Sequence, residues 1–246
     1  MLWYKSWLET RLWFFLACSA LVAQVIALYM SYPMDPVTTY PNGALGVLPH
    51  EMAQLRTGDF RGYIWVRWFS TTMLLIWPVF ALRLAGTGLE RERGREYLLS
   101  LPVSRRTIVV TRLAVVFLEI AAFTLLPSLV VCAMAPLVGQ RFPVSDMLAH
   151  SLILMAGGFG LFGLITFLRS VTTDAAAYMA GAAVFVLWGL LTFVAKGFVP
   201  YSVFRLMNGG EYFFDHHVPW TGLALSLAVG AAFIAVSTRM VEQRDF

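Results

Sequence analysis

The hydrophobic positions of this chain fall into six long runs, separated by shorter polar segments. A helix needs roughly 20 residues to cross a hydrocarbon core of about 30 Å, and every run is close to that length or beyond it. The runs predict transmembrane helices at about residues 12–30, 67–85, 107–136, 148–168, 175–195 and 219–238. The third run also contains Pro127 and Pro136, so we expect it to have a kinked or re-entrant outer end. The pattern predicts an all-α membrane protein with a single transmembrane domain over residues 1–246.

Composition supports a membrane protein and argues against a soluble one. Hydrophobic residues make up 59% of the chain and charged residues 13%, whereas soluble domains usually carry about 25% charged residues. The formal net charge of +4 is small, and the basic residues form no broad basic face. We therefore expect no nucleic-acid partner. Cys18 and Cys132 both lie inside apolar runs, where we expect small buried hydrophobes, with neither a disulfide nor a metal site.

The first residues carry a separate pattern. Within residues 1–11, Trp3, Trp7 and Leu8 alternate with Lys5 and Arg11 at roughly helical spacing, which predicts an interfacial helix lying along the membrane surface. The apolar run that follows continues well past a signal-peptide core, and no clear small-residue cleavage site closes it. We therefore expect the first run to be a retained span.

Orientation follows from the basic residues between the runs. With a cytoplasmic N-terminus, the inner segments hold twelve Lys and Arg residues and the outer segments six. Because cytoplasmic loops are enriched in these residues, we expect both termini to be cytoplasmic.

The segment between the second and third runs is the most informative. Residues 89–101 combine charges of both signs, among them Glu92, Arg95 and Glu96, with an apolar cluster around Leu98. Helical spacing makes these charges neighbours, so we expect an amphipathic cytoplasmic helix. Ser104 then caps the next span. The physics leaves two roles open: docking of a soluble partner, or contact of the arginines with anionic lipid.

The same segment resembles the first cytoplasmic loop of permease subunits of type-two ABC exporters. Those subunits typically read E-x-E-x-G-T, then a leucine-rich segment, then S-L-P-V-S-R before an apolar helix. This chain has Glu90, Glu92, Gly94, a Tyr-Leu-Leu cluster and residues 100–105 in the same order, with Arg95 in place of the threonine. The resemblance implies a coupling helix seated on the ATP-binding subunit. It assigns that contact to Glu90, Glu92, Arg93, Gly94, Glu96, Tyr97, Leu98, Leu99 and Leu101.

Partners and cofactors follow from this resemblance. The sequence has no G-x-x-x-x-G-K-[ST] loop to hold phosphates, so we expect no cofactor on this chain, with ATP and Mg²⁺ bound by a separate ATPase. The expected assembly has two ABC ATP-binding subunits and a second permease subunit, identical or homologous, among membrane lipids. It would export a lipid, glycan, peptide or drug-like substrate, and we favour a bacterial inner membrane.

A single acidic residue lies deep inside a run. Glu119 is about 16 Å into the third span, near the midplane, where a charge costs roughly 2.5–3.5 kcal/mol. Two roles stay open: a residue of the transport path or gate, or a hydrogen-bond partner for a neighbouring helix. His216 and His217 near Asp215 do not make a convincing metal site, because adjacent histidines point apart.

Two other functions remain possible from the sequence. In a membrane-embedded enzyme, Glu119 and the histidines would do the chemistry, although these groups are scattered over different depths. The chain could also be a non-transporting immunity or scaffold protein.

Small residues mark the fourth and fifth spans. Gly157, Gly160 and Gly163 recur every third position, and such a face lets helix backbones approach closely in lipid. Packing within the chain and a seam between subunits both fit this pattern.

The topology can be tested by labelling single cysteines from outside intact cells. We expect an impermeant thiol reagent to reach cysteines placed in residues 31–67 and 197–219 and to miss Arg93→Cys. Labelling of Arg93→Cys from outside would contradict cytoplasmic termini.

Overall fold

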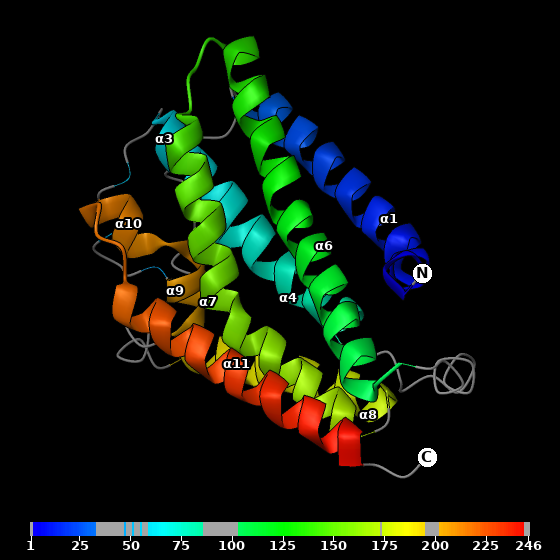
Figure 1. The fold of residues 1–246 in the computed structure, drawn as a ribbon. Coiled ribbons are helices and arrows are strands. Elements are labelled where there is room, and N and C mark those ends of the chain that lie inside the picture. The colour runs from blue at the N-terminus through cyan, green and yellow to red at the C-terminus, as the bar shows by residue number, and fades with distance from the viewer. Residues whose placement is uncertain are drawn as a thin grey trace.

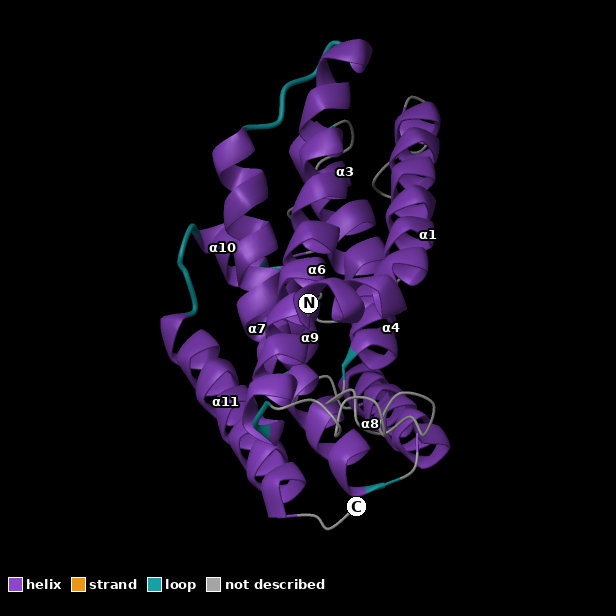
Figure 2. Cartoon of the chain, turned by 45° about the vertical axis from the view of Figure 1, so that its right-hand side comes forward, coloured by secondary structure: helices purple, strands orange, loops and turns teal. Residues whose placement is uncertain are grey.

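The computed structural model of the chain describes residues 2–32, 47, 51, 55, 59–85, 103–172, 174–194 and 202–243. All regular structure within these residues is helical, as the sequence predicts (Figure 2). The helices run side by side as an elongated bundle (Figure 1). The predicted coupling helix at residues 89–101 lies outside the described residues, so its contact residues stay a prediction.

Five helices are long and apolar enough to cross a membrane. They are α1 (Leu2–Ser31), the continuous helix Phe60–Leu84, Arg105–Val138, α7 (Val144–Val171) and α11 (Trp220–Gln243). The chain is therefore a multi-pass membrane protein, and the regular structure of its described residues is helical. A further helix, α8 (Asp174–Val194), matches the predicted fifth span and is apolar over Ala176–Thr192. The six-span topology and the cytoplasmic termini remain predictions.

The N-terminal residues are continuous with the first span. The sequence predicts an interfacial helix at residues 1–11 and a span from residue 12, but the structure has one helix over Leu2–Ser31. Figure 2 shows its first turns running crosswise to the rest of α1. The Thr10 hydroxyl oxygen lies 3.1 and 3.3 Å from the Ser6 and Trp7 carbonyl oxygens at this place. Such bonding to the preceding turn is common where helices bend.

The second long helix begins seven residues before the predicted span. Asp59 caps its first turn by accepting from the Arg61 and Gly62 amides, 3.1 and 3.2 Å away. The helix is built from α3 (Phe60–Ile64), the π-helical segment η3 (Trp65–Met73) and α4 (Leu74–Leu84). In η3, the hydroxyls of Thr71 and Thr72 each donate to the carbonyl five residues back. The wider turn presents buried rings on several sides, including Trp65 and Trp68.

The third long helix begins where the sequence predicts. Ser104 caps α6 (Arg105–Met134) by accepting from the Thr107 amide at 3.2 Å, which confirms the predicted cap. α6 passes through Pro127 and tightens into the 3-10 segment η4 (Ala135–Val138), which contains Pro136. Gly139 ends η4 in the left-handed region, with φ of 69°. The kinked or re-entrant end expected here is, in the structure, this tightened turn.

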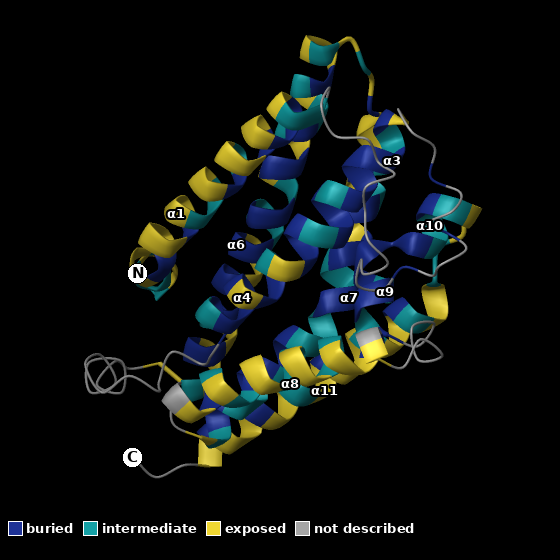
Figure 3. Cartoon of the chain, turned by 180° about the vertical axis from the view of Figure 1, so that it is seen from behind, coloured by how far each residue is buried: buried dark blue, intermediate teal, exposed yellow. Residues whose placement is uncertain are grey.

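α7 is the central helix of the bundle. It contacts α4, α6, α8, α11 and the short α9 (Val203–Asn208), and it packs along α11 more extensively than any other helix pair does. α1 lies on the opposite side and packs on α6 (Figure 1). The buried residues concentrate on the second helix, α6 and α7, while α1, α8 and α11 turn exposed apolar residues outward (Figure 3). In a bilayer these exposed faces meet lipid or another protein.

The small-residue face of α7 packs within the chain. A Cβ built on Gly163 would lie 2.5 Å from the Gly230 carbonyl oxygen of α11, so the two backbones touch. One turn earlier, a Cβ on Gly160 would lie 3.1 Å from the Ser226 hydroxyl oxygen, again on α11. The sequence leaves open whether these glycines pack within the chain or form a seam between subunits. The described contacts of Gly160 and Gly163 are packing within the chain.

Replacing one of these glycines tests the contact. We expect Gly163→Ala to push α11 off α7 and to lower the free energy of unfolding by about 1–3 kcal/mol, as overpacking does. Gly189→Ala on α8 is the matched control, because its Cβ would meet only the Phe204 ring at 3.8 Å. Thermal unfolding in detergent measures both variants. Equal stability of the two would contradict the backbone contact.

Candidate functional site: an apolar pocket beneath a polar cap

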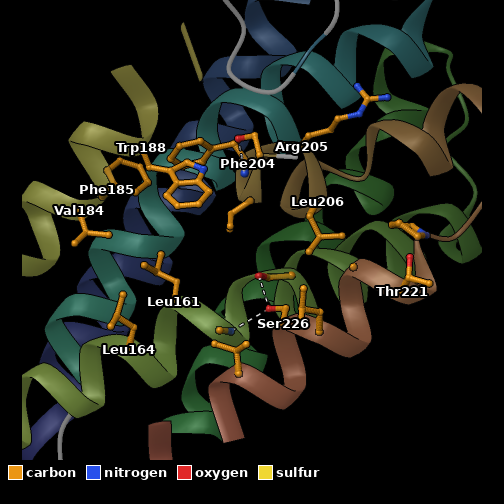
Figure 4. Close-up of a pocket in the computed structure, with 18 of the residues that line it drawn as sticks. Leu161, Leu164, Val184, Phe185, Trp188, Phe204, Arg205, Leu206, Thr221 and Ser226 are labelled. Atoms are coloured by element: carbon orange, nitrogen blue, oxygen red, sulfur yellow. Dashed lines mark hydrogen bonds between the residues drawn. The ribbon is translucent and has the colours of Figure 1, made fainter. Parts of the chain in front are cut away.

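A pocket of about 630 Å³ opens between α7, α8 and α11, beneath the short helix α9 (Figure 4). Ligand sites typically enclose about 300–1,000 Å³, so this pocket has room for a molecule of drug-like size. Apolar side chains form most of its wall, among them Leu161, Phe185, Trp188, Phe204 and Leu225.

Two glycines and one leucine shape the pocket at the α9 end. Leu206 of α9 sits between α7 and α11: a Cβ on Gly157 would lie 3.3 Å from its Cγ, and one on Gly222 2.9 Å from its Cδ1. Ser226 links the same two long helices, since its hydroxyl donates to the Gly157 carbonyl at 2.8 Å and accepts from the Gly160 amide at 3.0 Å. α9 therefore holds apart two helices that touch at their glycines farther along.

A buried ion pair fixes α9. Arg205 forms a bidentate pair with Glu51, with Nη1–Oε2 and Nη2–Oε1 distances of 2.8 and 2.6 Å. Both side chains are at least nine-tenths buried. Burial disfavours the charged guanidinium, but hydrogen bonding to Glu51 and the charges of Glu51, Glu211 and Asp215 outweigh it and raise the pKa of Arg205. Arg205 therefore stays charged and paired.

We call α9, α10 and the side chains packed against them the polar cap of the pocket. Beside the ion pair, this cap is held by aromatic and polar contacts around α10 (Gly210–Asp215). The Trp65 indole donates to the Asn208 carbonyl at 2.9 Å, and its ring stacks on Phe213 at 4.6 Å between centroids. His150 of α7 is 1% exposed and stacks on Phe69 at 4.8 Å. Among the described residues, neither ring nitrogen of His150 has a hydrogen-bond partner. Aromatic packing therefore holds this histidine in place.

Gly209 adopts a backbone conformation that favours glycine. Gly209 joins α9 to α10 with φ of 65°, in the left-handed region. A Cβ at this position would lie 2.8 Å from Nδ1 of His150. Both the backbone conformation and the close approach of the histidine thus require glycine at the turn.

Glu119 lies away from the pocket, on the face of α6 that meets α1. It is 3% exposed, and the Thr10 hydroxyl donates to its Oε1, while Oε2 has no hydrogen-bond partner among the described residues. Two turns earlier on α6, Arg112 donates to the Ser6 carbonyl at 2.9 Å and lies 3.4 Å from Glu9. The described contacts thus join Glu119 to a neighbouring helix. Its role in transport stays a prediction.

The two adjacent histidines lie between α10 and α11. His216 follows α10 with φ of 52°, and its ring meets Tyr212 edge-on. Within the described part of the chain, no three His, Cys, Asp or Glu side chains come together as a group that could hold a metal ion.

The pocket and the ion pair were missed by sequence reasoning. Arg205 and Glu51 are 154 positions apart, and each reads by itself as a solvated charge in an outer loop. One available signal was the composition of Val203–Asn208, where Arg205 stands among Phe, Leu and Met. A lone arginine in an apolar segment calls for a buried acidic partner.

Breaking the ion pair from one side should destabilise the cap. Arg205→Met leaves Glu51 buried without a partner, and we expect this to lower the free energy of unfolding by about 3–5 kcal/mol. The double variant Glu51→Leu with Arg205→Met removes both charges and should recover most of the loss. Unfolding in detergent, followed by tryptophan fluorescence, measures both. A double variant no more stable than Arg205→Met would contradict this assignment.

Comparison of the chain with protein-family models, with curated proteins and with solved structures finds no match in any of the three.

Proposed function

We propose that this chain is the membrane-spanning permease subunit of an ATP-driven ABC exporter in a bacterial inner membrane. It works with a second permease copy and two separate ATP-binding subunits. The observation that carries the proposal is the segment Glu90–Arg105, with its charged helix pattern and Ser-Leu-Pro-Val-Ser-Arg sequence, placed between two membrane-length helices. A permease that has no P-loop must receive work mechanically, and this segment is the place to receive it.

The helix that enters this segment is anchored to the bundle. Arg169 of α7 is 5% exposed and donates to the Ala85 carbonyl, directly after α4 ends. Arg83 donates to the Tyr178 hydroxyl of α8 at 3.0 Å and lies over the Trp13 ring of α1 at 4.5 Å. These contacts tie one end of the proposed coupling element to three other helices. Force applied to that element would therefore move α7 and α8 together with α4, which supports a mechanical role.

The scatter of the polar groups argues against a membrane-embedded enzyme. Glu119 is held against α1, whereas the Arg205 pair and His150 belong to the cap beside α9 and α10. Catalysis of hydrolysis or group transfer requires a nucleophile, a base and an oxyanion-stabilising group that converge on one point. A transport subunit needs no such convergence.

The proposal predicts that Leu98 is buried against an ATPase. Burying a leucine side chain contributes roughly 1.5–3 kcal/mol, so Leu98→Asp should weaken the association about 10- to 100-fold. The chain is purified from its native membrane with its partners, and ATP hydrolysis per permease is measured. Leu98→Cys should crosslink to a P-loop ATPase, and nucleotide should change the yield.

Leu137→Asp is the control, because Leu137 is an exposed leucine of η4, at the end of the helix Arg105–Val138 that is farthest in sequence from the segment Glu90–Arg105. It should retain the associated ATPase activity. An intact preparation with no P-loop ATPase, or a Leu98→Asp variant that keeps full ATPase activity, would overturn the proposal.

A further inference from the structure

The pocket beneath α9 is elongated. Along α11 its lining runs from Thr221 to Phe233, which is about 18 Å of helix. Its volume is about 630 Å³. A pocket of this length and volume has room for one extended alkyl chain.

Its length also matches a lipid chain. One leaflet of a bilayer has a hydrocarbon depth of roughly 15 Å, half of the whole core. The far end of the pocket is lined by apolar side chains, including Leu164, Val229 and Phe233. Polar side chains line the α9 end, where Ser202, Arg205, Glu211 and Thr221 lie. The pocket is thus apolar at its far end and polar at the α9 end. A molecule that matches both ends is amphipathic, with a hydrocarbon chain and a head group near α9.

The charge at the α9 end selects the head group. Arg205 and Glu211 are the charged residues of the lining. The Arg205 side chain points away from the other labelled residues of the pocket (Figure 4). Its guanidinium is bonded to both carboxylate oxygens of Glu51. The charges of Glu211 and Asp215 also act on Arg205, so two further carboxylates lie near the α9 end. The pocket therefore offers negative charge to whatever enters it.

Aromatic rings lie at the same end. Phe185 and Phe204 meet edge to face at 5.1 Å between ring centroids, and Trp188 lies beside them (Figure 4). The faces of such rings attract cations, and quaternary ammonium groups are often bound in aromatic cages. Of the other polar residues in the lining, Ser202 is bonded to Thr192 and Ser226 to the α7 backbone.

We infer that this pocket binds one membrane amphiphile, an alkyl or acyl chain that carries a cationic ammonium head group. The chain lies between α7, α8 and α11, and the head group meets Glu211 and the aromatic rings beneath α9. The assignment of this amphiphile as cargo rests on the proposed function, whereas its binding does not.

Trp188 provides the readout. The chain is reconstituted alone in phosphatidylcholine nanodiscs and titrated with a hexadecyl trimethylammonium probe that carries bromine, a quencher of indole fluorescence, on its alkyl chain. The matched probe is hexadecanoic acid brominated at the same carbon. Subtracting the emission of Trp188→Phe isolates one of the eight tryptophans. We expect saturable quenching by the ammonium probe at about tenfold lower concentration than by the acid.

Two variants and a control locate the site. Glu211→Gln should remove the preference for the ammonium probe and leave chain binding in place. Val229→Phe fills the pocket and should abolish saturable quenching by both probes. Val236→Phe is the control: it lies two turns further along α11, outside the lining, and Val236 and Val229 are 43% and 40% exposed. It should behave like the wild type.

Three results would overturn the inference. Linear quenching unaffected by Val229→Phe would mean that Trp188 senses bulk lipid. Saturable quenching that does not prefer the ammonium probe would reject the head group. Spontaneous disulfide dimers of Val184→Cys would make a second copy the occupant. The assay uses no ATPase, so quenching without a co-purifying ATPase would reject the export function alone, and ATP-coupled export without quenching would reject the pocket alone.

Discussion

The backbone contact between α7 and α11 determines how this side of the bundle is built. Two helices in lipid gain no hydrophobic free energy from meeting, so close packing of small residues has to hold them together. Gly163 and Gly230 permit that contact, and Ser226 reinforces it by bonding to the α7 backbone at two positions. Toward α9 the same helices separate, and Leu206 occupies the space between Gly157 and Gly222. The pocket extends along both levels, from Thr221 beside α9 to Phe233 beyond the glycine contact, and α8 forms another of its walls.

The separation of α7 from α11 in turn depends on the cap. α9 is only six residues long, too short to be stable as a helix in isolation. Three interactions with other residues therefore stabilise α9. They are the Arg205–Glu51 ion pair, the hydrogen bond from the Phe204 amide to Ser202, and the hydrogen bond from Trp65 to the Asn208 carbonyl. A buried ion pair adds little net stability over an apolar pair, yet its geometry is demanding. Its contribution here is to fix the position of α9, and through Leu206 the width of the pocket.

The long helices were predictable from the sequence, because hydrophobic runs of membrane length allow few alternatives, whereas the short helices α9 and α10 were not predicted. The Ser104 cap followed from local chemistry, and the glycine face of α7 from its spacing. Three features were not predictable. The π-helical turn of η3, the partner of Arg205 and the contact of Glu119 with Thr10 each depend on groups brought together by the fold. Periodicity reports which face of a helix is apolar, but it does not identify which helix covers that face.

α7 connects the pocket to the segment proposed to receive work. Gly157 lines the pocket, and Arg169 holds the Ala85 carbonyl at the end of α4. Twelve residues, about 18 Å of helix, separate Gly157 from Arg169. α7 contains no proline, and at Gly163 it packs directly against α11 with no room for an added Cβ. In the proposed exporter, a displacement at Ala85 would be passed along α7 toward Gly157 and Leu206, and it would change the width of the pocket. In the proposed exporter α8 would be a second link, because Arg83 at the end of α4 bonds to Tyr178 and the same helix lines the pocket with Val184, Phe185 and Trp188.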